Sequence, residues 1–181
     1  EGVAQNSLDA VSDRDFVVEV LAAAALAMVH LSRLAEELTW WSNPRFGFVR
    51  VADAYSTGSS MMPNKKNPDP AELVRGRAAR VIGELAGCLS MLKGLPLAYQ
   101  RDLQEDKPPL FDSVTTVKDA LQVFAAMLPE LTINSAAMES AAKDPNLLAT
   151  DLAEYLVKKG MPFREAHEAV GKLVARALQS K

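Results

Sequence analysis

Apolar residues recur along three segments of the chain at alternating spacings of four and three residues. The first set is Val17, Leu21, Ala24, Met28, Leu31, Ala35 and Leu38. The second set is Val74, Ala78, Val81, Leu85, Cys88 and Leu92. The third set is Leu110, Val114, Val117, Leu121, Phe124, Leu128 and Leu131. A repeat of about 3.5 residues is typical of long helices that pack side by side. The pattern therefore predicts an all-α fold with an extended bundle of long helices.

Prolines and glycines mark where these helices should end. Pro129 lies inside the third set and predicts a kink or break there. Beyond it, a segment that opens with Asp-Pro at 144 and stops at Gly160 is followed by a helical pattern that starts at Pro162. We therefore expect a partial central bundle domain over residues 1–143 and a truncated C-terminal helical domain, a short hairpin, over 144–181. Residues 46–51, "FGFVRV", are the only candidate strand.

The first long helix is apolar well beyond one stripe. Its additional apolar residues are Val18, Val20, Ala22, Ala25, Leu26 and Val29. A helix that is apolar on most sides must be covered on most sides, which favours an oligomer over the alternative, the central helix of a monomer. The most apolar run, 20–31, is shorter than the ~20 residues of a membrane span, so we expect no membrane partner.

A polar connection of about thirty residues, 40–69, separates the first two helices. Its segment 58–68, "GSSMMPNKKNP", crowds serines, lysines and an asparagine in front of the next helix. Asp69 is expected to be the N-cap of that helix, with Pro70 at its first position and Glu72 completing a capping box. Hydroxyl, amide and ammonium groups beside a helix N-terminus suit a small carboxylate or phosphate. The alternative is a solvated turn with ordinary surface lysines.

Composition narrows the function further. The net charge is −3 and no basic stripe is visible, so nucleic acid is not an expected partner. Cys88 is the single cysteine, which excludes an internal disulfide and fits a reducing compartment. No Cys/His cluster has metal spacing and no Gly-rich nucleotide loop occurs, so we expect neither a metal nor a cofactor. The chain begins at Glu1 rather than Met, and we expect it to be a piece of a longer protein.

The segment 58–68 resembles the GSSxMPxKxNP signature of the fumarase–aspartase superfamily, whose members release fumarate from substituted succinates. Four further stretches, at 6–16, 53–69, 93–107 and 147–172, resemble the argininosuccinate lyase family and the related delta-crystallins. The resemblance covers essentially the whole chain. It implies elimination of argininosuccinate to arginine and fumarate, in arginine biosynthesis or the urea cycle, by a homotetramer whose sites are shared between subunits.

The resemblance also implies roles for residues of the signature. Ser59 matches the proposed general base, and Ser60 is expected to support it. Lys65 and Asn67 match the contacts to the carboxylates of the fumarate moiety. Glu72 matches a glutamate that orients a catalytic histidine from another subunit. A serine hydroxyl is a weak base, so its alkoxide needs strongly positive surroundings.

The stretch "AYQRDLQEDK" is implied to hold the amino-acid end of the substrate through Tyr99, Gln104 and Lys107. Its alternative is a polar turn between helices. Arg14 is expected near the site as an organiser together with Asp13; alternatively, residues 12–15 only cap the first helix. These inferences give one of the three subunit contributions to each site.

Two departures from the family limit the implied activity. Residue 64 is asparagine where glutamine is usual, and the family's upstream segments with the catalytic histidine do not occur here. The two histidines, His30 and His167, match no catalytic position; we expect His30 to be packed or hydrogen-bonded. We therefore expect a lyase that is inactive in isolation. The alternatives are an inactive, delta-crystallin-like structural protein or another fumarate-releasing lyase. The expected location is the cytoplasm, or a plastid if the source is a plant or alga.

Overall fold

The computed structural model describes residues 2–179, except for the side chains of residues 145 and 146. The chain forms two compact units, the first ending at Ile133 and the second beginning at Asn134. This division falls at 133 rather than at the expected 143. The difference arises from helix α5 (Ser135–Ala142), which starts directly after the last strand of the first unit and buries none of its residues.

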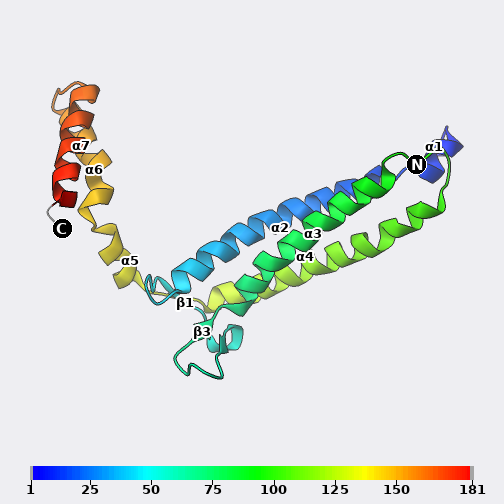
Figure 1. Cartoon of the computed structure of the whole chain (residues 1–181), viewed down its shortest axis with the longest axis horizontal. Helices are drawn as coiled ribbons and strands as arrows, with labels where there is room; N and C mark the ends of the chain where they lie inside the picture. Colours follow the sequence, from blue (N-terminus) through cyan, green and yellow to red (C-terminus); the bar gives the residue numbers. More distant parts are fainter. Residues whose placement is uncertain (1, 180–181) are drawn as a thin grey trace. The chain divides into compact units, whose positions relative to one another are not determined.

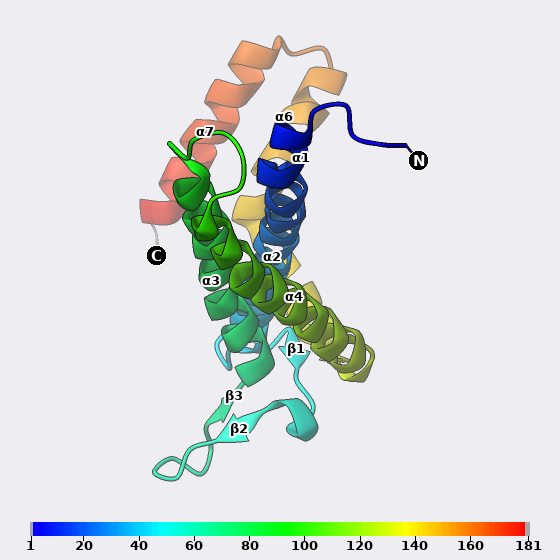
Figure 2. The ribbon, with the colours of Figure 1, turned by 90° about the vertical axis from the view of Figure 1, so that its right-hand side faces the viewer.

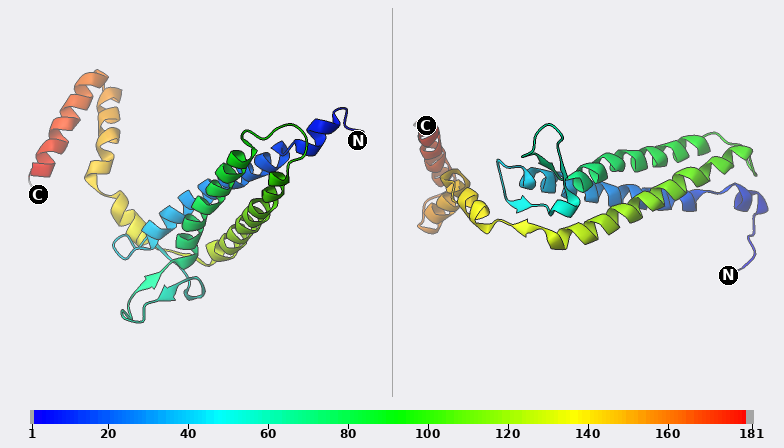
Figure 3. Two further views of the ribbon diagram at one scale, coloured as in Figure 1. Left: turned by 45° about the vertical axis from the view of Figure 1, so that its right-hand side comes forward. Right: turned by 90° about the horizontal axis from the view of Figure 1, so that it is seen from below.

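Three long helices form the first unit: α2 (Asp15–Ser42), α3 (Asp69–Leu92) and α4 (Lys107–Met127). They lie side by side and contact one another pairwise (Figure 1; Figure 3, right). The first two apolar sets lie where the sequence predicts. Of the first set only Leu31 is not fully buried, and the second set buries Val74, Ala78, Val81 and Cys88. The all-α bundle is therefore confirmed.

The third apolar set is only in part a core stripe. Phe124 is buried and Val117 packs partly buried against the core, whereas Val114 and Leu121 are exposed. The buried face of α4 consists of Ser113, Thr116, Ala120, Phe124 and Met127. The two polar residues of this face are satisfied by α3: the Ser113 hydroxyl donates to the Glu84 carboxylate, and Arg80 donates to the Thr116 hydroxyl at 2.5 Å. Hydrogen-bonded hydroxyls are compatible with burial, so α4 can turn this face inward.

The exposed apolar residues of α4 form an open groove with α2. Val114 and Leu121 are about half exposed, and Val117 and Val20 line the same groove, whose volume is about 510 Å³. Helix α2 also exposes Phe16, Leu26 and Val29, as expected. By length and composition alone α2 is apolar enough to cross a membrane, but its buried face packs in the bundle core.

Helix α4 breaks where Pro129 predicts a break. It ends at Met127 and continues as a 3-10 turn, η3 (Leu128–Glu130). The next residues, β4 (Thr132–Ile133), pair antiparallel with β1 (Val49–Arg50). Only these two residues of the expected strand 46–51 are in a strand. At the other end, short helix α1 (Ser7–Ser12) precedes α2, and a 3-10 helix, η2 (Arg101–Asp106), precedes α4.

The signature segment forms a small hairpin at one end of the bundle (Figure 2). After a turn at η1 (Asp53–Tyr55), β2 (Thr57–Gly58) pairs antiparallel with β3 (Lys66–Asn67). The predicted capping box at α3 is wrong. The Pro68 carbonyl already accepts from the Glu72 N–H at 3.1 Å, so Asp69 lies inside the first turn and makes no cap hydrogen bond.

The second unit is the expected helical hairpin. It contains α5, a 3-10 turn η4 (Pro145–Leu148), α6 (Ala149–Lys158) and α7 (Phe163–Gln179). Gly160 has φ +96°, a left-handed conformation that favours glycine and ends α6 as the sequence predicts. Ala153, Ala166 and Val170 bury the contact between α6 and α7.

Candidate active site

The predicted site residues form two groups at opposite ends of the bundle. The hairpin group consists of Ser59, Ser60, Lys65, Asn67 and Glu72. The corner group consists of Asp13, Arg14, Tyr99, Gln104 and Lys107, where α1 meets α2 and η2 meets α4 (Figure 1). Helix α3 separates them; its 24 residues span roughly 36 Å at about 1.5 Å per residue. One chain therefore cannot bring both groups to one substrate molecule.

Ser59 in the hairpin group forms a local turn with its own backbone. Its Oγ accepts hydrogen bonds from the backbone N–H groups of Met61 and Met62, both at 3.2 Å. Donors aimed at an oxygen favour its charged form. The tight turn after β2 thus supplies two fixed dipoles that would stabilise an alkoxide at Ser59.

The two lysines of the hairpin differ in their partners. Lys66 forms an ion pair with Asp53, whose pKa is lowered from its ordinary value, mainly by that hydrogen bond. The ammonium of Lys65 has no hydrogen-bond or ion-pair partner among residues 2–179, and the side chain is exposed. Lys65 is therefore available to an anion, as the signature implies, whereas Lys66 is occupied as a surface charge.

The remaining hairpin residues are set by the strand pair. Asn67 is half-buried in β3, and Ser60 is exposed at the turn. Gly58 pairs with Lys66 in the ladder, so it does not form a free hinge. Glu72 is exposed on the first turn of α3, where its carboxylate is not used as a cap. Asn64, Asn67 and Ser56 also line a hollow of about 230 Å³ at the base of the hairpin.

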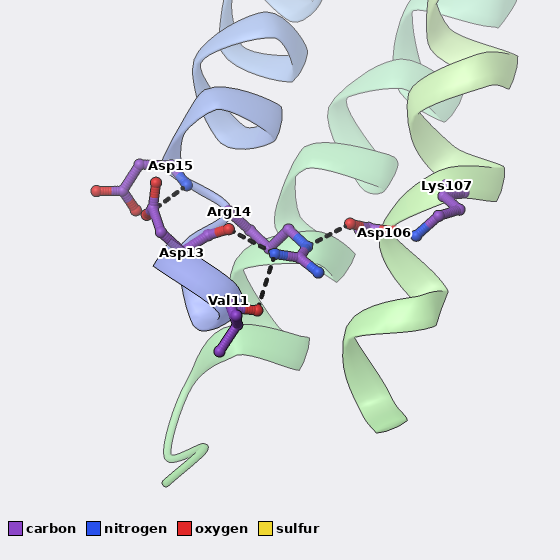
Figure 4. Close-up of polar contacts among 6 residues, drawn as sticks. All are labelled: Val11, Asp13, Arg14, Asp15, Asp106 and Lys107. Carbon is purple, nitrogen blue, oxygen red and sulfur yellow. Dashed lines mark hydrogen bonds and ion pairs between the residues drawn. The ribbon is translucent and has the colours of Figure 1, made fainter. Parts of the chain in front are cut away.

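The corner group is built around a buried ion pair (Figure 4). Arg14 Nε donates to Asp106 Oδ2 at 2.6 Å, and the two side chains are only 14% and 5% exposed. Arg14 Nη1 donates to the backbone carbonyl of Asp13 at 2.6 Å and to that of Val11 at 3.5 Å. Arg14 therefore ties the end of α1 to the start of α4.

Asp13 closes the turn between α1 and α2. Its carboxylate accepts from the Asp15 N–H at 3.0 Å, at the first residue of α2. The residue in the N-cap position of α2 is Arg14, whose side chain makes no cap hydrogen bond and instead makes the long-range contact to Asp106. The roles of Asp13 and Arg14 in the reaction stay predictions.

Lys107 and Gln104 lie one helical turn apart at the end of η2 and the start of α4, and both are exposed. The Lys107 ammonium donates to Asp106 Oδ1 at 2.9 Å. Tyr99 is about half exposed in the preceding loop, next to Ala98, which has a left-handed φ of +70°. A non-glycine residue in this conformation is uncommon and strained, and here the strain sets the direction in which the chain presents Tyr99.

An open groove of about 890 Å³ adjoins the corner group. Asp13, Arg14, Asp106 and Lys107 line it together with apolar Leu110 and Phe111. Its charged side chains and apolar wall suit an amino acid with an extended side chain.

The sequence reading missed Asp106. The available signal was the spacing of Leu103, Asp106 and Leu110, which places a carboxylate in line with two apolar residues of one helical face. Leu103 and Asp106 are both buried. An acid on a buried face needs partners, and Arg14 and Lys107 supply them.

The histidines lie outside both groups. His30 is exposed on α2, contrary to the expectation of a packed residue, and His167 lies in the second unit against the Phe163 ring at 6.1 Å between centroids. Within residues 2–179 no cluster of three His, Cys, Asp or Glu side chains has the geometry of a metal site.

Comparison with known proteins gives a consistent assignment. Residues 1–83 match the family model described as "Lyase", and residues 146–181 match the model described as "Argininosuccinate lyase C-terminal". The chain is 62% identical over 177 residues to the argininosuccinate lyase of Pelotomaculum thermopropionicum, which covers 98% of the chain and 38% of that relative. It is 56% identical over 181 residues to the argininosuccinate lyase of Variovorax paradoxus, covering 100% of the chain and 39% of that relative.

Solved structures share the fold. EDDS lyase in complex with formate matches with a TM-score of 0.86 and 30% identity, over 99% of this chain and 36% of that one. A class II fumarase from Schistosoma mansoni, at 17% identity and a TM-score of 0.75 over 93% of this chain and 38% of that one, shows the fold alone. The chain spans less than two fifths of the length of the curated relatives cited. Within that span, near-complete coverage at about 60% identity shows that the chain belongs to the argininosuccinate lyase family.

Proposed function

We propose that this chain contributes to the elimination of argininosuccinate to arginine and fumarate, in sites assembled from several copies. The observation that carries the proposal is Ser59, which directly follows β2 in the signature hairpin and whose Oγ accepts from two backbone N–H groups. The same hairpin contains Lys65, whose ammonium has no partner among residues 2–179. This setting supplies what a serine base needs, a stabilised alkoxide.

The reaction assigns each hairpin residue one task. Ser59 alkoxide takes the proton from the carbon next to a carboxylate, and the electron pair moves toward that carboxylate. Lys65 and Asn67 hold the carboxylate as its charge increases. The C–N bond then breaks, fumarate forms, and the guanidino nitrogen leaves with a proton from a general acid. Glu72 is proposed to orient that acid, a histidine of another subunit.

The corner group takes the amino-acid end of the substrate. Lys107 suits the α-carboxylate, and Gln104 and Tyr99 offer an amide and a phenol for the same end. The reacting end and the amino-acid end belong to one molecule, whereas the hairpin and corner groups lie at opposite ends of α3. We therefore propose that the hairpin of one copy meets the corner of another, within a homotetramer. The outward apolar stripes of α2 and α4 provide surface for that assembly.

The test is a chimera in which this chain replaces the matching 177 residues of the Pelotomaculum relative. Fumarate release from argininosuccinate is followed by absorbance. Ser59→Ala should lower kcat by a factor of about 10² to 10⁴, the usual contribution of a positioned base. Ser60→Ala, which removes an equivalent hydroxyl one residue away, is the matched control and should keep most of the rate.

Two results would contradict the proposal. One is a folded chimera that forms no fumarate, which would favour the structural, delta-crystallin-like alternative. The other is equal loss of rate in Ser59→Ala and Ser60→Ala, which would mean that the hairpin matters only as structure.

A further inference from the structure

We propose that Asp106 is a positioning residue that fixes the ammonium of Lys107 at the rim of the corner groove and thereby sets the affinity for the amino-acid end of the substrate. The inference rests on the proposed function in one respect, because it takes Lys107 as a substrate contact.

The Asp106 carboxylate bridges a buried group and an exposed group. Both carboxylate oxygens are used: Oδ2 by Arg14 Nε at 2.6 Å and Oδ1 by Lys107 Nζ at 2.9 Å (Figure 4). Asp106 is 4% exposed, whereas the Lys107 side chain is 58% exposed. One oxygen thus faces the protein and the other holds a group that faces solvent.

Arg14 keeps this carboxylate from turning. Its guanidinium is bound to two backbone carbonyls of the α1–α2 corner, those of Val11 and Asp13, in addition to Asp106. Arginine presents its donors in a rigid planar fork, so a carboxylate bound to a fixed guanidinium keeps its orientation.

Lys107 is a side chain that needs such a partner. An unrestrained lysine has a flexible four-carbon stem, and holding it in place costs up to about 2 kcal/mol of rotamer entropy. The bond to Asp106 uses one of its three N–H donors and leaves two for a ligand. Pro108 and Pro109 follow at once, and prolines have no N–H, so the first turn of α4 offers an anion few backbone donors.

The cations of the groove are placed unequally. Asp9, Asp13 and Asp106 line it together with Arg14 and Lys107, so its carboxylates outnumber its cations. Because Arg14 is buried against Asp106 whereas Lys107 is mostly exposed, the Lys107 ammonium is the cation that faces the groove. A ligand carboxylate would therefore bind at Lys107.

The test is a double-mutant cycle in the chimera, with Asp106→Asn, Lys107→Met and the double variant. If Asp106 acts through Lys107, each single variant should raise KM for argininosuccinate about tenfold or more, with kcat changed much less. The double variant should then be no worse than Lys107→Met alone. Asp102→Asn, an exposed acid in the same η2 turn, is the matched control and should leave KM unchanged.

A replacement variant and an independent measurement cover the case in which Asp106→Asn does not fold. If Asp106→Asn alone does not fold, as judged by circular dichroism, the paired variant Arg14→Gln/Asp106→Asn, which leaves no buried charge unpaired, replaces it in the cycle. Independently of activity, the acetylation rate of Lys107 in the chain itself is measured by peptide mass spectrometry. It should rise several-fold in the Asp106→Asn chain, because an ammonium held by a carboxylate must leave it before it reacts.

The outcomes separate the two proposals. Additive effects in the cycle, or an unchanged acetylation rate at Lys107, would overturn the positioning role. A folded wild-type chimera without fumarate release would overturn the proposed function instead, and the acetylation measurement alone would then decide the role of Asp106.

Discussion

The two ends of the bundle hold their polar residues in opposite ways. At the corner end, Arg14 and Asp106 are nearly buried and bonded to each other and to backbone carbonyls. At the hairpin end, Lys65 and Ser60 are exposed, and the pair between Lys66 and Asp53 is exposed as well. The Ser59 hydroxyl accepts hydrogen bonds from the backbone of its own turn.

This difference shows that a segment with an easily recognised sequence motif is not necessarily the most rigidly held part of the molecule. The hairpin has the more recognisable sequence, but only one strand pair with two residue pairs and one turn hold it together. The corner is organised by a long-range ion pair that no short motif reveals. The corner is therefore held by contacts within one chain, whereas most of the hairpin's polar side chains are open to solvent.

The largest expected effect on stability is at the corner. Arg14→Ala leaves Asp106 buried with only the Lys107 ammonium beside it, and breaking a buried pair by removing one partner costs about 3–5 kcal/mol. The free energy of unfolding, measured with urea, should fall by an amount in this range. Arg77→Ala, on an exposed face of α3, is the control and should change it by less than about 0.5 kcal/mol. Equal effects of the two variants would mean that the buried ion pair does not stabilise the corner end more than an exposed residue does.

A second variant tests whether burial or neighbouring charge determines the protonation state of Glu84. Glu84 on α3 has a raised pKa, mainly because of burial and then because of its hydrogen bond with Asp112. The folded state therefore holds a proton that the unfolded state releases, and stability falls as pH rises from about 4.5 through the folded pKa. Glu84→Gln keeps the hydrogen bonds and removes this titration.

Urea unfolding at pH 4 and pH 7 measures the prediction. The advantage of the Glu84→Gln chain over wild type should be larger at pH 7 than at pH 4. An advantage that shrinks on going to pH 7 would mean that Glu84 is charged in the folded chain and that Arg80 outweighs Asp112.

Limited proteolysis compares the two ends directly. Trypsin should cut after Lys65 or Lys66, in the exposed hairpin, well before it cuts after Arg14, whose side chain is 14% exposed and held by backbone carbonyls. The order of the cuts is read by mass spectrometry. Cleavage after Arg14 first would show that the corner opens more readily than the hairpin.

The smallest expected effect is at the hairpin pair. Lys66→Ala removes the partner of Asp53, but both side chains are mostly exposed and water and salt screen such pairs. The pKa of Asp53 is lowered, so the stabilisation exists at neutral pH and is lost as pH falls through the folded pKa. The urea midpoint at pH 7 should stay within experimental error. A clear decrease would mean that the hairpin is more firmly held than its exposure indicates.

Much of the fold follows from local chemistry. The stripes of α2 and α3, the break at Pro129 and the glycine that ends α6 were each predictable, because each depends on residues within a few turns of one another. The capping box at Asp69 was predicted wrongly, because the helical hydrogen bonds already begin at the Pro68 carbonyl and place Asp69 inside the first turn. The hairpin was recognisable by its motif. The motif did not show that Lys66 is paired with Asp53 while the neighbouring Lys65 has no such partner among residues 2–179.

The sequence by itself determined which segments are helices and that α2 and α3 bury their apolar stripes. Only the tertiary structure decided the rotation of α4, which buries Ser113 and Thr116 and turns Val114 and Leu121 outward. The physical reason is that polar groups can be buried when they are hydrogen-bonded. Their partners here lie far away in the sequence, and the spacing of apolar residues contains no information about such partners. The same holds for Asp106, which lies against Arg14 although the two residues are 92 positions apart in the sequence.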